Sequence, residues 1–366
     1  MGNQSMNQRR MLWAALVVVT VLLTNCGKQI DSSTLVAHYA TIAVARHELD
    51  GEGQVASVEA ADSASADMRN AVVVVPSVTV PAAVASTTPE SMPVPMTMAA
   101  LPGSIPDDGA VPFEPTILAA RMLELVNHDR AAAGLGLVSW DDTAAAAGQD
   151  HTDDMVHRGF FSHWNPDGLG PDHRYSAAGG RHVARENLYT FSLTYEDGRG
   201  APVNDWEVII EQAQASLMGS LGHRENILDP AHTHVGIGLT YDPVLGQFLL
   251  AQEFTNQHVT LSLPLPTEAR PGDLLRVVGS FGPETVGGGI LDLAHEPFPA
   301  PLSPADLTGR STYMSTAKSV GSSRSVASQF DEIITLPPTP GYYHVRLFVD
   351  LESGQALVMD HIAAVR

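Results

Sequence analysis

The residues of this chain best suited to chemistry are its histidines, which are numerous and concentrated in one stretch. The sequence contains 15 of them, and eight fall between His151 and His234. Imidazole nitrogens ligate divalent metals and exchange protons near neutral pH, so the stretch suits metal binding or acid–base catalysis. The standard forms of this chemistry are absent: the sequence has no His-Glu-x-x-His zinc motif, no Gly-x-Ser-x-Gly nucleophile motif and no Gly-x-x-x-x-Gly-Lys phosphate loop.

One cysteine and a strong negative charge narrow the function classes further. Cys26 is the only cysteine, which excludes an internal disulfide and a zinc site built from cysteines. Its position near the N-terminus also leaves the folded part without a cysteine nucleophile. The 20 Lys and Arg against 41 Asp and Glu give a formal net charge of −21. This charge argues against binding nucleic acids or docking on anionic lipids through a basic patch.

The N-terminal residues have the organisation of a secretion signal. A polar stretch ends in two arginines, and an apolar run follows from Met11 to Leu23. The run is too short to span a bilayer, which takes about 20 apolar residues. Leu23–Cys26 resembles a bacterial lipobox, although Asn25 replaces the usual Gly, Ala or Ser. We predict a signal over residues 1–26, diacylation of Cys26, and an exported lipoprotein of the outer membrane or cell surface; without the lipid, the protein would be secreted.

Residues 27–112 are predicted to form a disordered, acidic tether rich in Ala, Val and Pro. They carry ten acidic residues against three basic ones. Seven prolines between Pro76 and Pro106 prevent regular structure in the second half of the segment. The run Ala71–Val75 is β-prone, and we interpret it as a sticky patch within the linker.

Residues 113–258 carry the periodicities of an α+β domain. Apolar residues recur every three or four positions in three stretches, which predicts helices, and two later stretches alternate with period two around a turn. Helices followed by an antiparallel hairpin favour a layered α+β architecture. The predicted helices cover residues 116–133, 143–158 and 206–218, and the predicted strands cover residues 235–241 and 248–254.

Residues 259–366 have a different pattern. Short strand-like runs separated by Pro, Gly and Ser occupy most of this stretch, and residues 311–328 are interpreted as a Ser-rich loop. Six or seven short strands in such a length predict a β-sandwich-like all-β domain. No part of the stretch concentrates titratable residues, so we expect a supporting or adhesive module.

Seven short segments in a fixed order connect residues 115–257 to a known family. No single segment is specific, but together they closely resemble the CAP superfamily (cysteine-rich secretory proteins, antigen 5 and pathogenesis-related 1), in its bacterial, cysteine-poor branch. The resemblance implies a CAP-type α-β-α sandwich with a central antiparallel sheet. The segments are Leu125-Val-Asn-His-Asp-Arg130, Leu137-Val-Ser-Trp-Asp141, His151-Thr-Asp-Asp-Met155, Phe160-Phe-Ser-His163, Arg185-Glu-Asn-Leu188, Gly222-His-Arg-Glu-Asn-Ile-Leu-Asp-Pro230 and Val235-Gly-Ile-Gly238.

The resemblance also implies a site. The family places two histidines and one or two glutamates around a shared cleft, and these positions correspond here to His163, Glu186 and His223. The family's second glutamate falls near Ser220, so that acid is missing. Two imidazoles and a carboxylate can bind a divalent metal such as zinc, with an open position for water, or transfer protons. In a third interpretation, hydrogen bonds among these side chains only hold the cleft together.

Three functions from different classes agree with these features. The one we favour is non-catalytic binding at the cell envelope, with a small hydrophobic ligand or a surface protein as partner, no nucleic acid, and membrane contact only through the N-terminal lipid. The second is a metal-dependent hydrolase or peptidase that uses His163, Glu186 and His223. The third is surface adhesion through the β domain. The missing second acid and the lack of a nucleophile argue against an enzyme, whereas fold alone does not choose.

Overall fold

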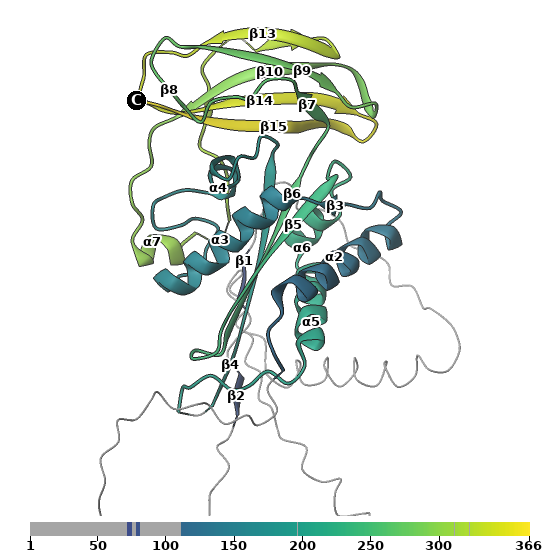
Figure 1. The fold of residues 1–366 in the computed structure, drawn as a ribbon, viewed down its shortest axis with the longest axis vertical. Coiled ribbons are helices and arrows are strands. Elements are labelled where there is room, and N and C mark those ends of the chain that lie inside the picture. The colour runs from purple at the N-terminus through teal and green to yellow at the C-terminus, as the bar shows by residue number, and fades with distance from the viewer. Residues whose placement is uncertain (1–71, 75–77, 81–110, 196, 311, 322) are drawn as a thin grey trace, which may run out of the picture.

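The computed structural model describes residues 72–74, 78–80 and 111–366, apart from residues 196, 311 and 322. The predicted signal, Cys26 and most of the predicted tether lie outside these residues. Figure 1 shows the sheets of the C-terminal domain stacked above the helices and sheet of the N-terminal domain. Within the described part of the chain, no helix is long and apolar enough to cross a membrane.

A sheet forms the middle layer of the N-terminal domain. β4 (Ala184–Tyr195), β6 (Gln247–Thr255) and β5 (His234–Asp242) lie antiparallel at its centre, and β5 and β6 form the predicted hairpin. The short β3 (Ser139–Trp140) pairs in parallel with β5 at one edge. Every residue of β6 after Gln247 is buried, because alternate side chains face the two helical layers on opposite sides of the sheet.

Helices cover both faces of this sheet, which confirms the predicted α-β-α sandwich. α2 (Pro115–Ala132) and α5 (Trp206–Gly219) bury their apolar faces against one side of β5 and β6. α3 (Asp142–Arg158) and α4 (Pro171–Ala177) cover the other side, and the short α6 (Leu221–Ile227) follows α5. The three helices predicted from apolar periodicity are α2, α3 and α5.

Two glycines of β5 allow α3 to approach the sheet closely. A Cβ built on Gly236 would lie 2.0 Å from the backbone nitrogen of Ala145, and one on Gly238 would lie 2.2 Å from the backbone carbon of Gly148. A larger residue at either place would push the helix away from the strand. The Val-Gly-Ile-Gly segment therefore allows α3 to pack closely against the sheet.

Two short strands belong to the segment predicted as a disordered tether. β1 (Val72–Val74) and β2 (Val78–Val80) pair in parallel with β4, at the edge opposite β3. β1 falls in the β-prone run that we interpreted as a patch within a linker, so this part of the chain differs from the expectation. Consecutive valines favour an extended backbone, and the free edge of β4 supplies the hydrogen bonds that such a backbone needs.

The C-terminal domain consists of two sheets that share one apolar core, as predicted for a β-sandwich. β10 (Thr285–Glu296), β14 (Gly341–Leu351) and β15 (Gly354–Val365) run antiparallel at the centre of the larger sheet. Two short strands fall within residues 311–328, predicted as loop, and both pair with β10. The remaining elements are β7 (Val259–Leu261), β8 (Glu268–Ala269), β9 (Leu274–Phe281), α7 (Pro304–Thr308), β11 (Lys318–Ser319), β12 (Arg324–Val326) and β13 (Gln329–Thr335).

The two domains contact each other through α4 and through the connection between β10 and β11. α4 packs against β15, and Figure 1 shows it between the domains. The connection contains α7, which lies beside α3, and its Leu307 and Tyr313 pack against Trp164 of the N-terminal domain. The β domain therefore covers the loop that carries the predicted site residue His163.

Candidate functional site

The sheet brings two glutamates opposite each other at the start of β4. Glu186 of β4 is in register with Glu253 of β6, and both side chains are completely buried. Because side chains alternate across a strand, both carboxyls point to the face covered by α3, where Leu188 and Ala251 pack against Met155. Two buried carboxyl groups this close together do not both ionise, since each charge disfavours the other.

His163 reaches Glu186 from the loop after α3. The helix ends at Gly159, whose φ of 68° reverses the direction of the chain. The loop is held against the helix, because Nε2 of His151 lies 2.9 Å from the carbonyl oxygen of Ser162. Nδ1 of His163 then lies 2.7 Å from Oε1 of Glu186. This contact leaves Nε2 of His163 buried and without a hydrogen-bond partner.

Arg174 of α4 neutralises Glu186. Its Nη2 lies 2.6 Å from Oε2 of Glu186, and its Nη1 donates a hydrogen bond to the carbonyl oxygen of His163 at 2.8 Å. Burial alone would raise the pKa of Glu186, but Arg174, together with His151 and His163, holds this pKa well below its usual range. Glu186 is therefore a carboxylate with both oxygens occupied.

Glu253 is the acid that sequence reasoning missed. Burial, and then the neighbouring Glu186, raise the pKa of its carboxyl well above the usual range, so Glu253 is the protonated member of the pair. The resemblance directed attention to the helix near Ser220, which lies at the C-cap of α5. The structure supplies the second acid from the neighbouring strand instead. The alternation in β6 signalled the face of Glu253, but not its pairing with β4.

His223 of α6 lies within electrostatic range of His163 but makes no hydrogen bond to it. Both of its ring nitrogens are buried without a hydrogen-bond partner. Burial, assisted by His163, lowers the pKa of His223 to about 3, so the ring is neutral. Its carbonyl oxygen accepts a hydrogen bond from Asn187 at 3.2 Å. The structure thus joins His163 to Glu186 and leaves His223 beside His163 rather than on the carboxylate.

These contacts bear on the predicted metal set. The unpartnered nitrogens of His163 and His223 suit a metal, because a neutral imidazole binds zinc through such an atom. Glu186 does not suit it as a ligand, because Arg174 and His163 occupy its oxygens. Two imidazoles would hold an ion there, with Glu186 orienting one ring. Across the described residues, the groups of three ligand atoms that lie within 4.8 Å of one another are elsewhere, around His344.

The network has little access to solvent. Its two glutamates and the two predicted histidines are completely buried. A cavity of about 560 Å³ opens beside it, and Arg174 and His151 are the parts of the network that line this cavity. A molecule in the cavity would meet this guanidinium, a neutral imidazole and three aspartates of α3 rather than the His163–Glu186 pair. The arrangement can share a proton between two carboxyls and fix an imidazole, but it presents no nucleophile to the cavity.

Comparison with known proteins agrees with the resemblance. Residues 123–254 match the cysteine-rich secretory protein family, CAP. The Bacillus subtilis protein YkwD, which is uncharacterised, is 26% identical over 118 residues, covering 32% of this chain and 40% of YkwD. The uncharacterised membrane protein YlbC of the same organism is 29% identical over 127 residues, covering 32% of this chain and 30% of YlbC. The matches thus span less than half of the relatives' own lengths.

One solved structure matches part of this chain. An extracellular protein containing an SCP domain from Bacillus anthracis is 26% identical, and the match covers 38% of this chain and 40% of that one, with a TM-score of 0.30. The CAP domain predicted from the seven segments is confirmed by the family match, whose bounds lie inside the predicted residues 115–257.

Proposed function

Residues 123–254 form a CAP domain, and we propose that this domain serves a non-catalytic binding role in an exported protein of the cell envelope. The observation that carries the proposal is the burial of the site that the family resemblance implies. His163, Glu186 and His223 are completely buried, and the carboxylate is neutralised by Arg174. A hydrolase needs a polarised water or nucleophile in reach of its substrate, and this network offers neither to the adjacent cavity.

A groove between the two domains is the binding surface that we assign to this role. Its volume is about 750 Å³, and residues of both domains line it. Arg185, Arg224 and Asn226 contribute from the CAP domain, and the start of β15 contributes Gln355. Charged and amide walls suit a segment of a partner protein better than the small hydrophobic ligand suggested by the resemblance. We therefore propose a surface protein as the partner.

The hydrolase alternative is tested with the full chain. We expect no turnover of casein or p-nitrophenyl esters above that of the variant His163→Ala/His223→Ala, after thermal melting has shown that both proteins are folded. Hydrolysis that disappears in this double variant would overturn the binding role.

The groove is tested by photo-crosslinking on intact cells of origin. A benzoylphenylalanine at Gln355 should give one discrete crosslinked species. The same residue at Asn204, an exposed position after the far end of β4, serves as the control and should give none. Equal crosslinking from both positions, or none from Gln355, would contradict the assignment of the groove.

We also propose that Cys26 carries the lipid that anchors the protein to the envelope. The support is the order of charged residues, short apolar run and cysteine in residues 1–26. Palmitate should label the wild-type chain, and Cys26→Ser should abolish this labelling and release the protein from the membrane fraction. Labelling that persists in Cys26→Ser would refute the lipid anchor.

A further inference from the structure

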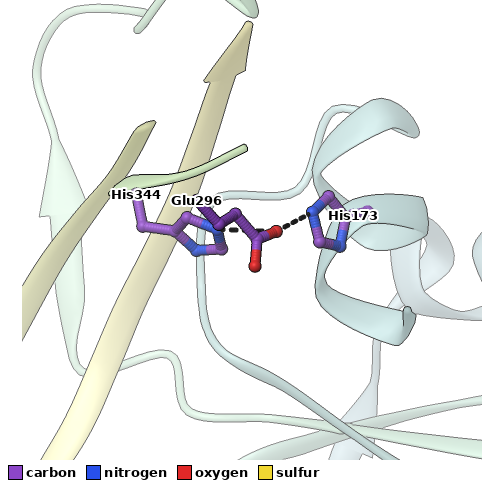
Figure 2. A group of neighbouring side chains, drawn as sticks. All are labelled: His173, Glu296 and His344. Carbon is purple, nitrogen blue, oxygen red and sulfur yellow. Dashed lines mark ion pairs between the residues drawn. The ribbon is translucent and has the colours of Figure 1, made fainter. Parts of the chain in front are cut away.

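A second group of buried titratable side chains lies between the two domains. Figure 2 shows His173 of α4, Glu296 at the end of β10 and His344 of β14 converging on one point. None of the three is more than 6% exposed. Two aspartates, Asp172 and Asp360, lie behind the histidines. The expectation that the β domain concentrates no titratable groups is therefore wrong.

Asp360 orients the imidazole of His344, whereas Nδ1 of His173 lies beside Asp172 and accepts a hydrogen bond from the backbone N–H of Gly170 at 3.4 Å. Nδ1 of His173 lies 2.9 Å from Oδ1 of Asp172, and Nδ1 of His344 lies 2.8 Å from Oδ1 of Asp360. An imidazole held in this way by a carboxylate presents its Nε2 to whatever lies in front of it. Histidine ligands of metals are oriented by the same contact, which also increases their basicity.

Both Nε2 atoms face one oxygen of Glu296. The distance to Oε1 is 2.6 Å from His173 and 3.4 Å from His344. Neither nitrogen makes an aligned hydrogen bond, although both are buried. The other oxygen of Glu296 accepts a hydrogen bond from Thr316 at 2.5 Å, which holds the carboxylate in place.

We propose that His173, His344 and Glu296 bind one divalent transition-metal ion, with zinc as the best match, and that this ion joins the CAP domain to the β domain. Two imidazoles and one carboxylate are an established zinc set, which leaves a fourth position for water. The ligand atoms all lie within 4.8 Å of one another. Tetrahedral zinc separates its ligand atoms by about 3.3 Å, so the His344–Glu296 distance already fits and the His173–Glu296 distance widens on binding.

The charges of the cluster also suit a divalent ion. Its three carboxylates face one arginine, Arg346, whose Nε lies 3.2 Å from Asp360. This leaves two negative charges uncompensated, and they can be balanced by protons on both imidazoles or by one divalent ion. A metal therefore replaces two protons without changing the net charge of the buried cluster, and the large cost of an uncompensated buried charge does not arise.

The proposed ion would stabilise the domain interface rather than perform catalysis. Its ligands come from both domains, and Tyr313 of the β domain covers the site by a hydrogen bond from its hydroxyl to Asp172. Arg174, which follows the ligand His173 on α4, holds Glu186 of the CAP site. The ion would thus fix the helix on which the CAP network depends.

The metal content of the full chain, purified without a histidine tag and dialysed, tests the site. We expect one equivalent of zinc per chain in the wild type and in the control His128→Gln, which changes an exposed histidine. Both His344→Gln and Glu296→Gln should lose this equivalent, whereas His163→Ala/His223→Ala should keep it. If His163→Ala/His223→Ala loses the zinc while His344→Gln and Glu296→Gln keep it, the ion is bound at the CAP site and the proposal is wrong.

A measurement on the wild type alone covers the case in which the variants do not fold. After treatment with a chelator, zinc should bind with a stoichiometry of one in a calorimetric titration, and it should raise the thermal midpoint of the stripped protein. Magnesium, which prefers oxygen ligands, should do neither. A stripped wild type that binds no zinc would overturn the proposal.

Discussion

Two buried histidine–carboxylate clusters are attached to α4, and they differ in the groups that neutralise their acids. On the CAP side, Glu186 is neutralised by Arg174, and the neighbouring His223 has a pKa lowered to about 3 by burial. On the β-domain side, burial would lower the pKa of His344, but Asp360 and Glu296 raise it to about 10. Near neutral pH the histidine is therefore uncharged at His223 and charged at His344.

The comparison shows that the nearest cation decides what a buried carboxylate can bind. A guanidinium does not give up its proton, so the Arg174 contact blocks Glu186 as a metal ligand. Imidazolium does give up its proton, so Glu296 stays available to an ion that displaces it. Histidines and acids occur in both places, but Glu186 is paired with an arginine and Glu296 with two histidines, and this difference separates the two chemistries.

The largest expected effect comes from removing that arginine. Arg174→Met leaves the Glu186 carboxylate buried without its counter-ion, which costs about 3–5 kcal/mol in the free energy of unfolding. Urea denaturation measures this loss. Adding Glu186→Gln should recover part of it, because the stranded charge is then removed.

An exposed arginine provides the matched control. Arg158 of α3 pairs with Asp154 and Asp167 at the surface, and Arg158→Met should cost less than about 1 kcal/mol. If Arg174→Met destabilises the protein no more than Arg158→Met, then Arg174 does not neutralise a buried carboxylate and the contrast between the clusters fails.

Local patterns allowed much of the CAP domain to be predicted from sequence. The helices and the β5–β6 hairpin follow from apolar periodicity, which is a property of neighbouring residues. His163 and Glu186 were found through their segments, and the structure places their side chains in contact. Their role as a metal set stays a prediction.

Non-local pairing explains what the sequence did not reveal. Glu253 faces Glu186 only because of the register between β4 and β6, and that register depends on packing across the whole sheet. The second cluster combines His173, Glu296 and His344 from segments far apart in the chain. No spacing rule connects such residues, so the sequence pattern of the β domain does not reveal the cluster.

A medium effect is expected from the residues that orient the proposed zinc ligands. Asp360→Asn weakens the acceptor behind His344, and loss of such a partner lowers metal affinity by about 10–100-fold while the stoichiometry stays at one. Competition with a chromogenic chelator measures the affinity. Asp350→Asn, an exposed change on the same strand as His344, is the control. Unchanged affinity in Asp360→Asn would contradict the orienting role.

The smallest expected effect is that of Glu253→Gln on stability. It can be recognised because it depends on pH. The folded protein raises the pKa of Glu253 above the ordinary value of 4.5. Below that pH the side chain is protonated in both folded and unfolded states, so Glu253→Gln changes little. As pH rises above 4.5, the unfolded chain loses its proton first, and the wild type loses stability until the folded pKa is passed.

Glu253→Gln escapes this loss, because an amide has no proton to give up. The variant should therefore match the stability of the wild type near pH 4 and exceed it at pH 8. Thermal midpoints across this pH range measure the gap, with the exposed Glu352→Gln as control. A gap that is constant with pH would mean that Glu253 keeps an ordinary pKa, and the CAP cluster would then contain two carboxylates rather than one carboxylate and one acid.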